Sequence, residues 1–189
     1  MTVRRGFRSE AERVSVAIRT DLGIGAGDPL PLAEAARARK AEVVSAADLV
    51  DIERLVELER IQAFAFSACT FELDGKSVIV FNPLRSPARQ QSDVAHELSH
   101  LLLGHTLSEI REVAGLPFRT CRTDQEEEAT TLGGTLLLPR PLLLQAIRRG
   151  LGVDEIARTY SVTPEMARFR LNTTGVVRQI ERSQAARAR

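Results

Sequence analysis

Residues 86–104, SPARQQSDVAHELSHLLLG, decide how the rest of the sequence is interpreted. Ser86 is a favoured helix N-cap, and Pro87 suits the first helical position because its fixed φ is already helical. Gly104 supplies a stop, since glycine accepts the left-handed conformation in which many helices end. The segment from Ala88 to about Leu103 is therefore predicted to be one helix.

Two histidines on this predicted helix have the spacing of metal ligands. His96 and His100 are four positions apart, so both imidazoles project from one face of the helix. Glu97 is rotated by about 100°, which favours contact with a water molecule over contact with the ion. This is the H-E-x-x-H pattern, in which two histidines bind zinc and the glutamate acts as general base. The pattern also occurs by chance, but the chain has only three histidines and two of them hold this spacing.

A zinc site of this kind needs a third protein ligand. In a continued helix His105 would face about 180° away from His96, so it is interpreted as a surface or loop histidine. Glu126 opens the next predicted helix, and small residues follow it on the same face at i+3, i+4 and i+7. Such a face can pack closely against the metal helix. Glu126 is predicted as the third ligand, with Glu128 as the alternative. Zinc is the expected ion, and manganese remains an alternative.

Composition places the chain among ordinary globular proteins. Hydrophobic residues make up 43% and charged residues 27% of its 189 residues, and 26 basic residues nearly balance 25 acidic ones. This balance does not favour DNA or a membrane as the main partner. Cys69 and Cys121 are isolated, which is typical of reduced thiols in a cytoplasmic protein. Neither a signal peptide nor a membrane span is expected.

The predicted secondary structure is mostly helical. The first helix is expected to start at a capping box formed by Ser9 and Glu12 and to end at Gly23. Asp74-Gly75 predicts a tight hairpin between two strands. The other elements expected from periodicity and turn signals are helices over 31–40, 46–61, 126–138, 141–149, 153–160 and 164–171, a strand over 41–45, and a loop with one helical piece over 105–123.

Together these elements predict an α+β fold, mostly helical, with a small antiparallel sheet. A zincin-like metallopeptidase domain is expected over 1–140, a C-terminal helical module over 141–180 packed on it, and a disordered basic tail over 181–189. The module has a helix-turn-helix cadence, and its second helix carries Arg168 and Arg170. It lacks the basic stripe that DNA binding needs, so it is interpreted as a packing module.

Two motifs resemble the ImmA/IrrE metallopeptidase family. RQQSDVAHELSHLLLGH at 89–105 is similar to the family's R-Q-x-x-x-L-A-H-E-L-x-H, and EEEATTLGGTLLLP at 126–139 is similar to E-x-x-A-N-x-F-A-A-x-L-L-M-P. RGFRSEAERVSVAIRTDLG at 5–23 looks like a lead-in helix of the family, and IVFNP at 79–83 looks like the strand before its metal helix. The resemblance covers about residues 5–175.

The resemblance implies a minimal gluzincin-like fold, with His96, His100 and Glu126 as zinc ligands and Glu97 as catalytic base. It also implies cleavage of a helix-turn-helix repressor. The chain departs from the family where Thr130 replaces Asn or Asp, where Leu132 replaces Phe, and where two glycines at 133–134 replace two alanines. None of these departures is expected to touch a proposed ligand.

The sequence therefore predicts a zinc-dependent endopeptidase whose substrate is a regulatory protein, such as a helix-turn-helix repressor or an antitoxin-like regulator. The substrate is expected to pair as an extended strand with a sheet edge near 76–81. The alternatives are a non-proteolytic zinc-containing transcriptional regulator, or a helical protein-binding module without metal. Glu97 favours the enzyme, because a structural zinc site has no need of a general base.

Overall fold

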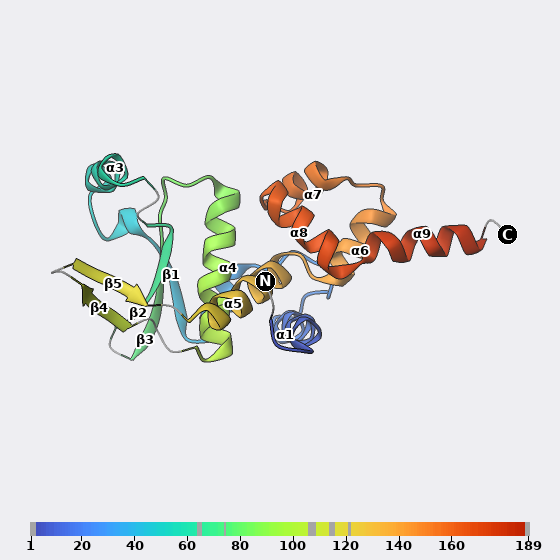
Figure 1. Cartoon of the computed structure of the whole chain (residues 1–189), viewed down its shortest axis with the longest axis horizontal. Coiled ribbons are helices and arrows are strands. Elements are labelled where there is room, and N and C mark those ends of the chain that lie inside the picture. The colour runs from blue at the N-terminus through green and yellow to red at the C-terminus, as the bar shows by residue number, and fades with distance from the viewer. Residues whose placement is uncertain are drawn as a thin grey trace.

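A three-stranded sheet packs against one long helix, residues Pro87–Leu103, at the middle of the molecule (Figure 1). The structure is a computed structural model that describes residues 3–63, 66–73, 75–105, 109–113, 116–120 and 122–187. In chain order its elements are α1 (Phe7–Asp21), α2 (Leu32–Arg37), β1 (Ala41–Ser45), the 3-10 turn η1 (Ala46–Asp48), α3 (Ile52–Ile61), β2 (Ala68–Leu73), β3 (Lys76–Phe81), α4 (Pro87–Leu103), β4 (Glu109–Val113), β5 (Leu116–Thr120), α5 (Thr123–Leu137), α6 (Arg140–Arg148), α7 (Val153–Thr159), α8 (Pro164–Thr174) and α9 (Val176–Arg187).

The three-stranded sheet has the order β1-β3-β2. β2 and β3 pair antiparallel as the predicted hairpin, with Leu73 opposite Lys76. Gly75 has a φ of 74° at their turn, the left-handed conformation that favours glycine; Asp74 lies outside the described residues. β1 joins on the other side of β3 and runs parallel to it. The sheet is thus mixed, whereas an antiparallel one was expected, and β2, rather than the 76–81 strand, is an edge.

The helices bury one continuous apolar core. It contains side chains from α1, α2, β3 and α4 together with side chains from α5 to α8. The C-terminal helices lie on the other side of α4 and α5 from the sheet, and α9 extends away from them (Figure 1). The core is shared between the N-terminal part and the C-terminal helices, and the division into two packed domains stays a prediction. The α+β class is confirmed, and the boundary at residue 140 stays a prediction.

Two buried arginines join α1 to the end of α5 and to α8. Arg19 is fully buried and donates to the backbone oxygens of Asp28 and Leu136 at 2.9 and 2.8 Å. Burial lowers the pKa of its guanidinium to about 10. Arg170 donates to the oxygen of Leu138 at 3.0 Å and to Glu12 at 2.6 Å. The bonds to Leu136 and Leu138 satisfy carbonyl groups that the C-terminal end of α5 leaves without partners.

Three local predictions differ from the structure for tertiary reasons. α1 begins at Phe7, which is fully buried, and no side chain caps it. The expected capping partner Glu12 instead accepts hydrogen bonds from the Arg140 amide and from Arg170. The expected 46–61 helix is divided into η1 and α3.

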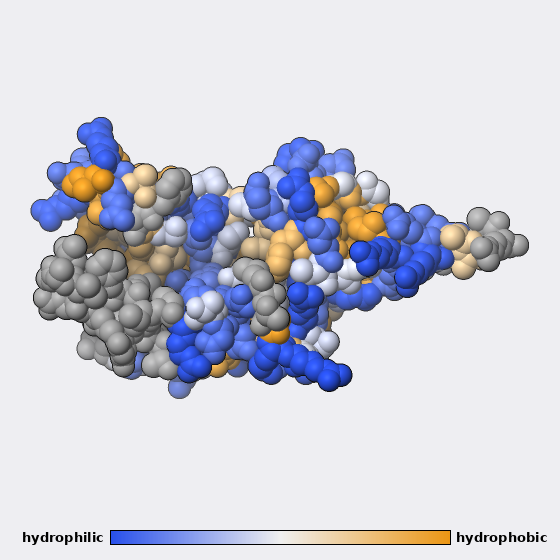
Figure 2. Space-filling view, viewed as in Figure 1, coloured by the Kyte–Doolittle hydropathy of each residue, from blue (hydrophilic) through white to orange (hydrophobic). Residues whose placement is uncertain are grey.

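Two further predictions on the outer parts of the fold also differ. The expected loop over 105–123 contains the hairpin β4–β5; Cys121 lies outside the described residues. The tail predicted to be disordered over 181–189 continues as α9 through residue 187. The surface of α9 is mostly hydrophilic (Figure 2). Apolar side chains are instead exposed over α3, where Ile61 is 76% exposed. Among the described residues, no helix is both long and apolar enough to cross a membrane.

Candidate metal centre

The helix that carries the predicted ligands forms as the sequence indicates. α4 runs from Pro87 to Leu103, and the Ser86 hydroxyl accepts a hydrogen bond from the Arg89 amide at 3.4 Å. Val94 and Leu98 are buried in the core. Their burial fixes the rotation of the helix, so the histidine face is turned toward α5. His96 lies in the middle of α4, about two turns from its C-terminal end, and His100 lies in its last turn.

Three donor atoms converge between α4 and α5. The Nε2 atoms of His96 and His100 are 3.0 Å apart, and one Glu126 oxygen lies 3.1 Å from His96 Nε2. The other Glu126 oxygen lies 3.4 Å from His100 Nε2. In the part of the chain that the structure describes, these three residues are the one group whose geometry could hold a metal ion. His96 and Glu126 remain 28% and 37% exposed, so the cluster is open on one side.

This donor set fits a catalytic zinc ion. Tetrahedral zinc with bonds of about 2.0–2.1 Å holds its ligand atoms roughly 3.4 Å apart, close to the spacings of the three donors. Two imidazoles and one carboxylate form a known catalytic zinc set that leaves a fourth position for water or substrate. The structure brings together the three residues predicted as ligands. The alternative Glu128 lies elsewhere, against His105 and Arg4.

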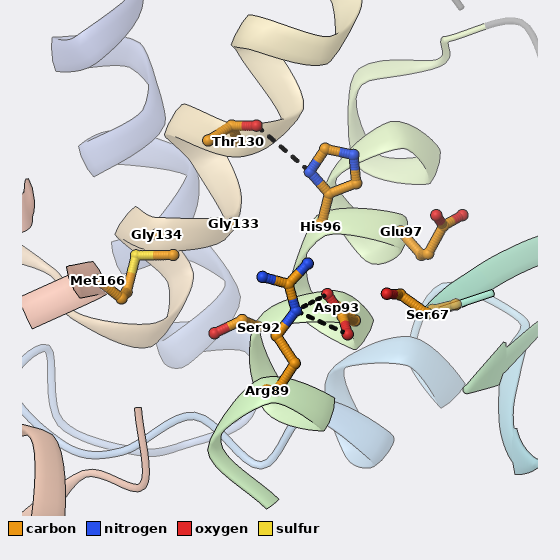
Figure 3. A pocket seen from close by; sticks show the side chains of 11 residues that line it. Ser67, Arg89, Ser92, Asp93, His96, Glu97, Thr130, Gly133, Gly134 and Met166 are labelled. Atoms are coloured by element: carbon orange, nitrogen blue, oxygen red, sulfur yellow. Dashed lines mark hydrogen bonds and ion pairs between the residues drawn. The ribbon is translucent and has the colours of Figure 1, made fainter. Parts of the chain in front are cut away.

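Glu97 stands beside this cluster and outside it. Its Oε2 accepts a hydrogen bond of 2.7 Å from the hydroxyl of Thr70 on β2. Both Glu97 and His96 line a cavity of about 360 Å³ between the sheet edge, α4, α5 and α8 (Figure 3). The arrangement offers a carboxylate for proton transfer next to a position for a metal ion. Thr70 was not among the predicted site residues, because nothing in its local sequence marks it.

The cavity floor carries an ion pair on α4. The Arg89 Nε lies 2.9 and 3.2 Å from the two oxygens of Asp93, one helical turn further on (Figure 3). Burial raises the pKa of the Asp93 carboxyl, and Arg89 opposes part of that shift. Met166 of α8 closes the opposite wall. The C-terminal helices therefore contribute a wall of the cleft as well as core packing.

Two departures from the family pattern do touch the predicted ligands, against expectation. The Thr130 hydroxyl lies 3.5 Å from the outer nitrogen, Nδ1, of His96 (Figure 3). Gly133 faces the backbone of Ala95 and His96, where an added Cβ would meet three atoms at 3.2 Å. Gly133 therefore allows α5 to approach α4 closely at the ligand itself.

His105 lies in the loop that follows α4, as one of the two predicted alternatives had it, but it is not at the surface. Its side chain is only 7% exposed, and its Nδ1 lies 3.0 Å from Nδ1 of His100, the nitrogen that faces away from the donor cluster. It is also not part of the three-donor group. The helix does not continue past Leu103, so the rotation assumed for a longer helix does not apply.

Replacing Gly133 by Ala is expected to lower the free energy of unfolding by about 1–3 kcal/mol, the usual cost of overpacking. The new methyl group would meet main-chain atoms of α4, which can move only with the whole helix. This loss should exceed the roughly 0.5–1 kcal/mol that Ala gains over Gly in a helix. Urea denaturation of the metal-free protein measures the difference.

Gly134→Ala is the matched control for this prediction. An added Cβ there meets the side chains of Met166 and Arg170, and the unbranched Met166 can adjust its rotamer. Gly134→Ala should therefore cost less than Gly133→Ala. If Gly133→Ala is at least as stable as wild type, α4 and α5 can separate enough to accept the added methyl group, and the prediction is wrong.

Comparison with known proteins identifies a similar fold and a family. A Mycobacterium tuberculosis transcriptional regulator of known structure has a similar fold, with a TM-score of 0.53 and 20% sequence identity. The match covers 89% of the present chain and 47% of that protein, so the chain spans about half its length. No curated protein sequence matches the chain significantly. The sequence model of the IrrE N-terminal-like domain, Peptidase_M78, matches residues 46–172, a span that holds α4, α5 and every residue of the cluster; the chain thus belongs to the IrrE N-terminal-like family of peptidases.

Proposed function

We propose that this protein is a zinc-dependent endopeptidase, with His96, His100 and Glu126 as metal ligands and Glu97 as general base. The observation that carries this proposal is the position of Glu97, which lines the same cavity as His96 without joining the donor cluster. A structural zinc site needs no such carboxylate. Membership in a peptidase family supports the same conclusion.

The chain's own residues divide the chemistry between them. A zinc ion held by the three donors would polarise the scissile carbonyl and make a nearby water easier to deprotonate. Glu97 takes the proton from the attacking water and delivers it to the leaving amine. Thr70 donates to Oε2 of Glu97 at 2.7 Å. This bond fixes the carboxylate and leaves Oε1 for the water.

The substrate binds as an extended strand along β2. Within the described residues the pairing partner of β2 is β3, and an added peptide backbone would pair along the opposite side of β2. Ala68 of β2 and the preceding Ser67 line the cavity together with His96 and Glu97. A peptide added to that edge would run past the proposed site. The central strand β3, first expected to offer the edge, is paired on both sides.

The proposed substrate is a cytoplasmic regulatory protein, such as a helix-turn-helix repressor or an antitoxin-like regulator. The family resemblance and the likeness to a transcriptional regulator support a regulatory setting. Direct DNA binding by the C-terminal helices is not expected. Arg170, one of two arginines that could have faced DNA, is 3% exposed and bonded to Glu12.

The experiment is cleavage of purified candidate regulators by the zinc-loaded protein. A helix-turn-helix regulator encoded near this protein's own gene is the first substrate to test, with mass spectrometry to locate the cut. We expect one or a few internal cuts that disappear when a chelator removes the metal and return when zinc is restored. Cleavage that persists in the chelator would contradict the proposed metal dependence.

A further inference from the structure

The end of α4 brings a third histidine back onto the metal helix. Gly104 adopts the left-handed conformation, with a φ of 64°. The His105 amide then donates to the oxygen of His100 at 3.0 Å, and the Gly104 amide donates to the oxygen of Leu101 at 3.2 Å. This pair of bonds is the Schellman motif. It reverses the chain and places the His105 ring against the His100 ring, with centroids 5.1 Å apart.

A line of hydrogen bonds leads outward from the donor cluster through this ring. His100 Nδ1 lies 3.0 Å from His105 Nδ1, and His105 Nε2 lies 3.4 Å from a Glu128 oxygen. The other Glu128 oxygen accepts from Arg4 Nε at 2.8 Å. His105 and Glu128 are 7% and 17% exposed. The line therefore passes through two mostly buried side chains and ends on the exposed cation of Arg4.

Metal binding at His100 determines which ring nitrogen of each histidine along this line carries the proton. A metal ion on His100 Nε2 requires the neutral ring to carry its proton on Nδ1, so that Nδ1 donates. His105 Nδ1 must then accept, which places the His105 proton on Nε2. That proton points to Glu128, and a carboxylate can only accept. Every group along the line has a compatible role, and no donor faces another donor.

We propose that His105 and Glu128 are positioning residues that hold His100 in the orientation and tautomer required for metal binding. The proposal rests on the proposed metal site but does not depend on peptidase activity. Partners of this kind on the outer nitrogen of a ligand histidine orient its ring and tune the metal site. His96 is held less firmly, since its outer nitrogen has only the Thr130 hydroxyl at 3.5 Å among the described residues. His100 is therefore the anchored ligand of the pair.

The first test is the zinc affinity of His105 variants, measured by competition with a chromophoric chelator. His105→Leu removes the acceptor for His100 Nδ1 and should weaken zinc binding by about 10–100-fold, the usual effect of losing such a partner. His105→Asn offers its Oδ1 near the place of Nδ1 and should recover most of the affinity. Leu103→Ala, which trims the same helix end, is the matched control and should leave the affinity unchanged.

Rescue by Asn separates positioning from general packing, because Leu fills the site better than Asn but cannot accept a hydrogen bond. Equal zinc affinity in wild type and His105→Leu would overturn the proposal and leave the metal site standing. If wild type bound no zinc, the proposed function would fail as well. Should His105→Leu not fold, Glu128→Leu tests the same line from its outer end, and unchanged affinity there would also contradict it.

The second test is the tautomer of His105 in the zinc-loaded protein. The chain has three histidines, so long-range ¹H–¹⁵N correlation spectra would contain only three ring patterns. We expect His100 to carry its proton on Nδ1 and His105 to carry its proton on Nε2, with an unprotonated Nδ1. A proton on Nδ1 of His105 would break the line at its first bond and refute the proposal.

Discussion

Replacing Glu97 by Gln is expected to reduce substrate cleavage by about 10²–10⁴-fold while the fold and the zinc content stay unchanged. The amide keeps the size of the side chain and can still accept the Thr70 hydrogen bond, but it cannot take a proton from water. Glu97 lies outside the three-donor cluster, so its charge is not needed to hold the ion. Initial rates on a cleaved regulator, together with metal analysis of the same samples, measure the effect.

Thr70→Val is the matched variant for this experiment. It keeps the Glu97 carboxylate and removes the hydroxyl that holds it at 2.7 Å, so its loss of rate should be smaller than that of Glu97→Gln. Equal cleavage by wild type and Glu97→Gln would rule out the proposed general base. If both proteins bind zinc and neither cuts any regulator, the alternative of a non-proteolytic zinc-containing regulator gains support.

Removal of any one of the three donors is expected to abolish stoichiometric zinc binding. A catalytic zinc site uses three protein ligands. Each of the variants His96→Ala, His100→Ala and Glu126→Ala would leave only two. Zinc content after dialysis should fall from one ion per chain to a small fraction. Elemental analysis of the purified variants, with circular dichroism as a check of folding, measures this loss.

His105→Ala is the informative comparison for the metal ligands. Its ring supports His100 from the outer side without joining the cluster, so the variant should still load about one zinc ion at micromolar protein, with weaker affinity. The opposite pattern, with zinc lost from His105→Ala and retained by Glu126→Ala, would show that the third ligand has been assigned wrongly.

The parts of the site that follow from local sequence were predictable. α4 has its start and stop signals within the printed sequence, and the spacing of His96 and His100 fixes their shared face. Glu126 was predictable because small residues on one face of its helix indicated which side packs on α4. The helix α5 itself begins at Thr123, slightly earlier than its periodicity indicated.

The remaining parts depend on contacts between distant segments. Thr70 meets Glu97 across 27 positions of sequence, and that contact depends on the packing of β2 against α4. His105 lies in a loop, as predicted, but its burial against His100 was not predicted, because that contact depends on the turn at Gly104. The hairpin β4–β5 has weak alternation in sequence, and pairing with each other stabilises its strands.

The two helices that supply the donors pack directly on each other at the site, although His100 and Glu126 are 26 positions apart along the chain. An ion that binds both helices therefore also links them, and any ligand that binds only the folded chain stabilises it. At free zinc 100 times the dissociation constant, this linkage adds about 2.7 kcal/mol to the free energy of unfolding. Cellular zinc supply would then set the lifetime of the protein as well as its activity, so a zinc-starved cell would hold fewer copies of it.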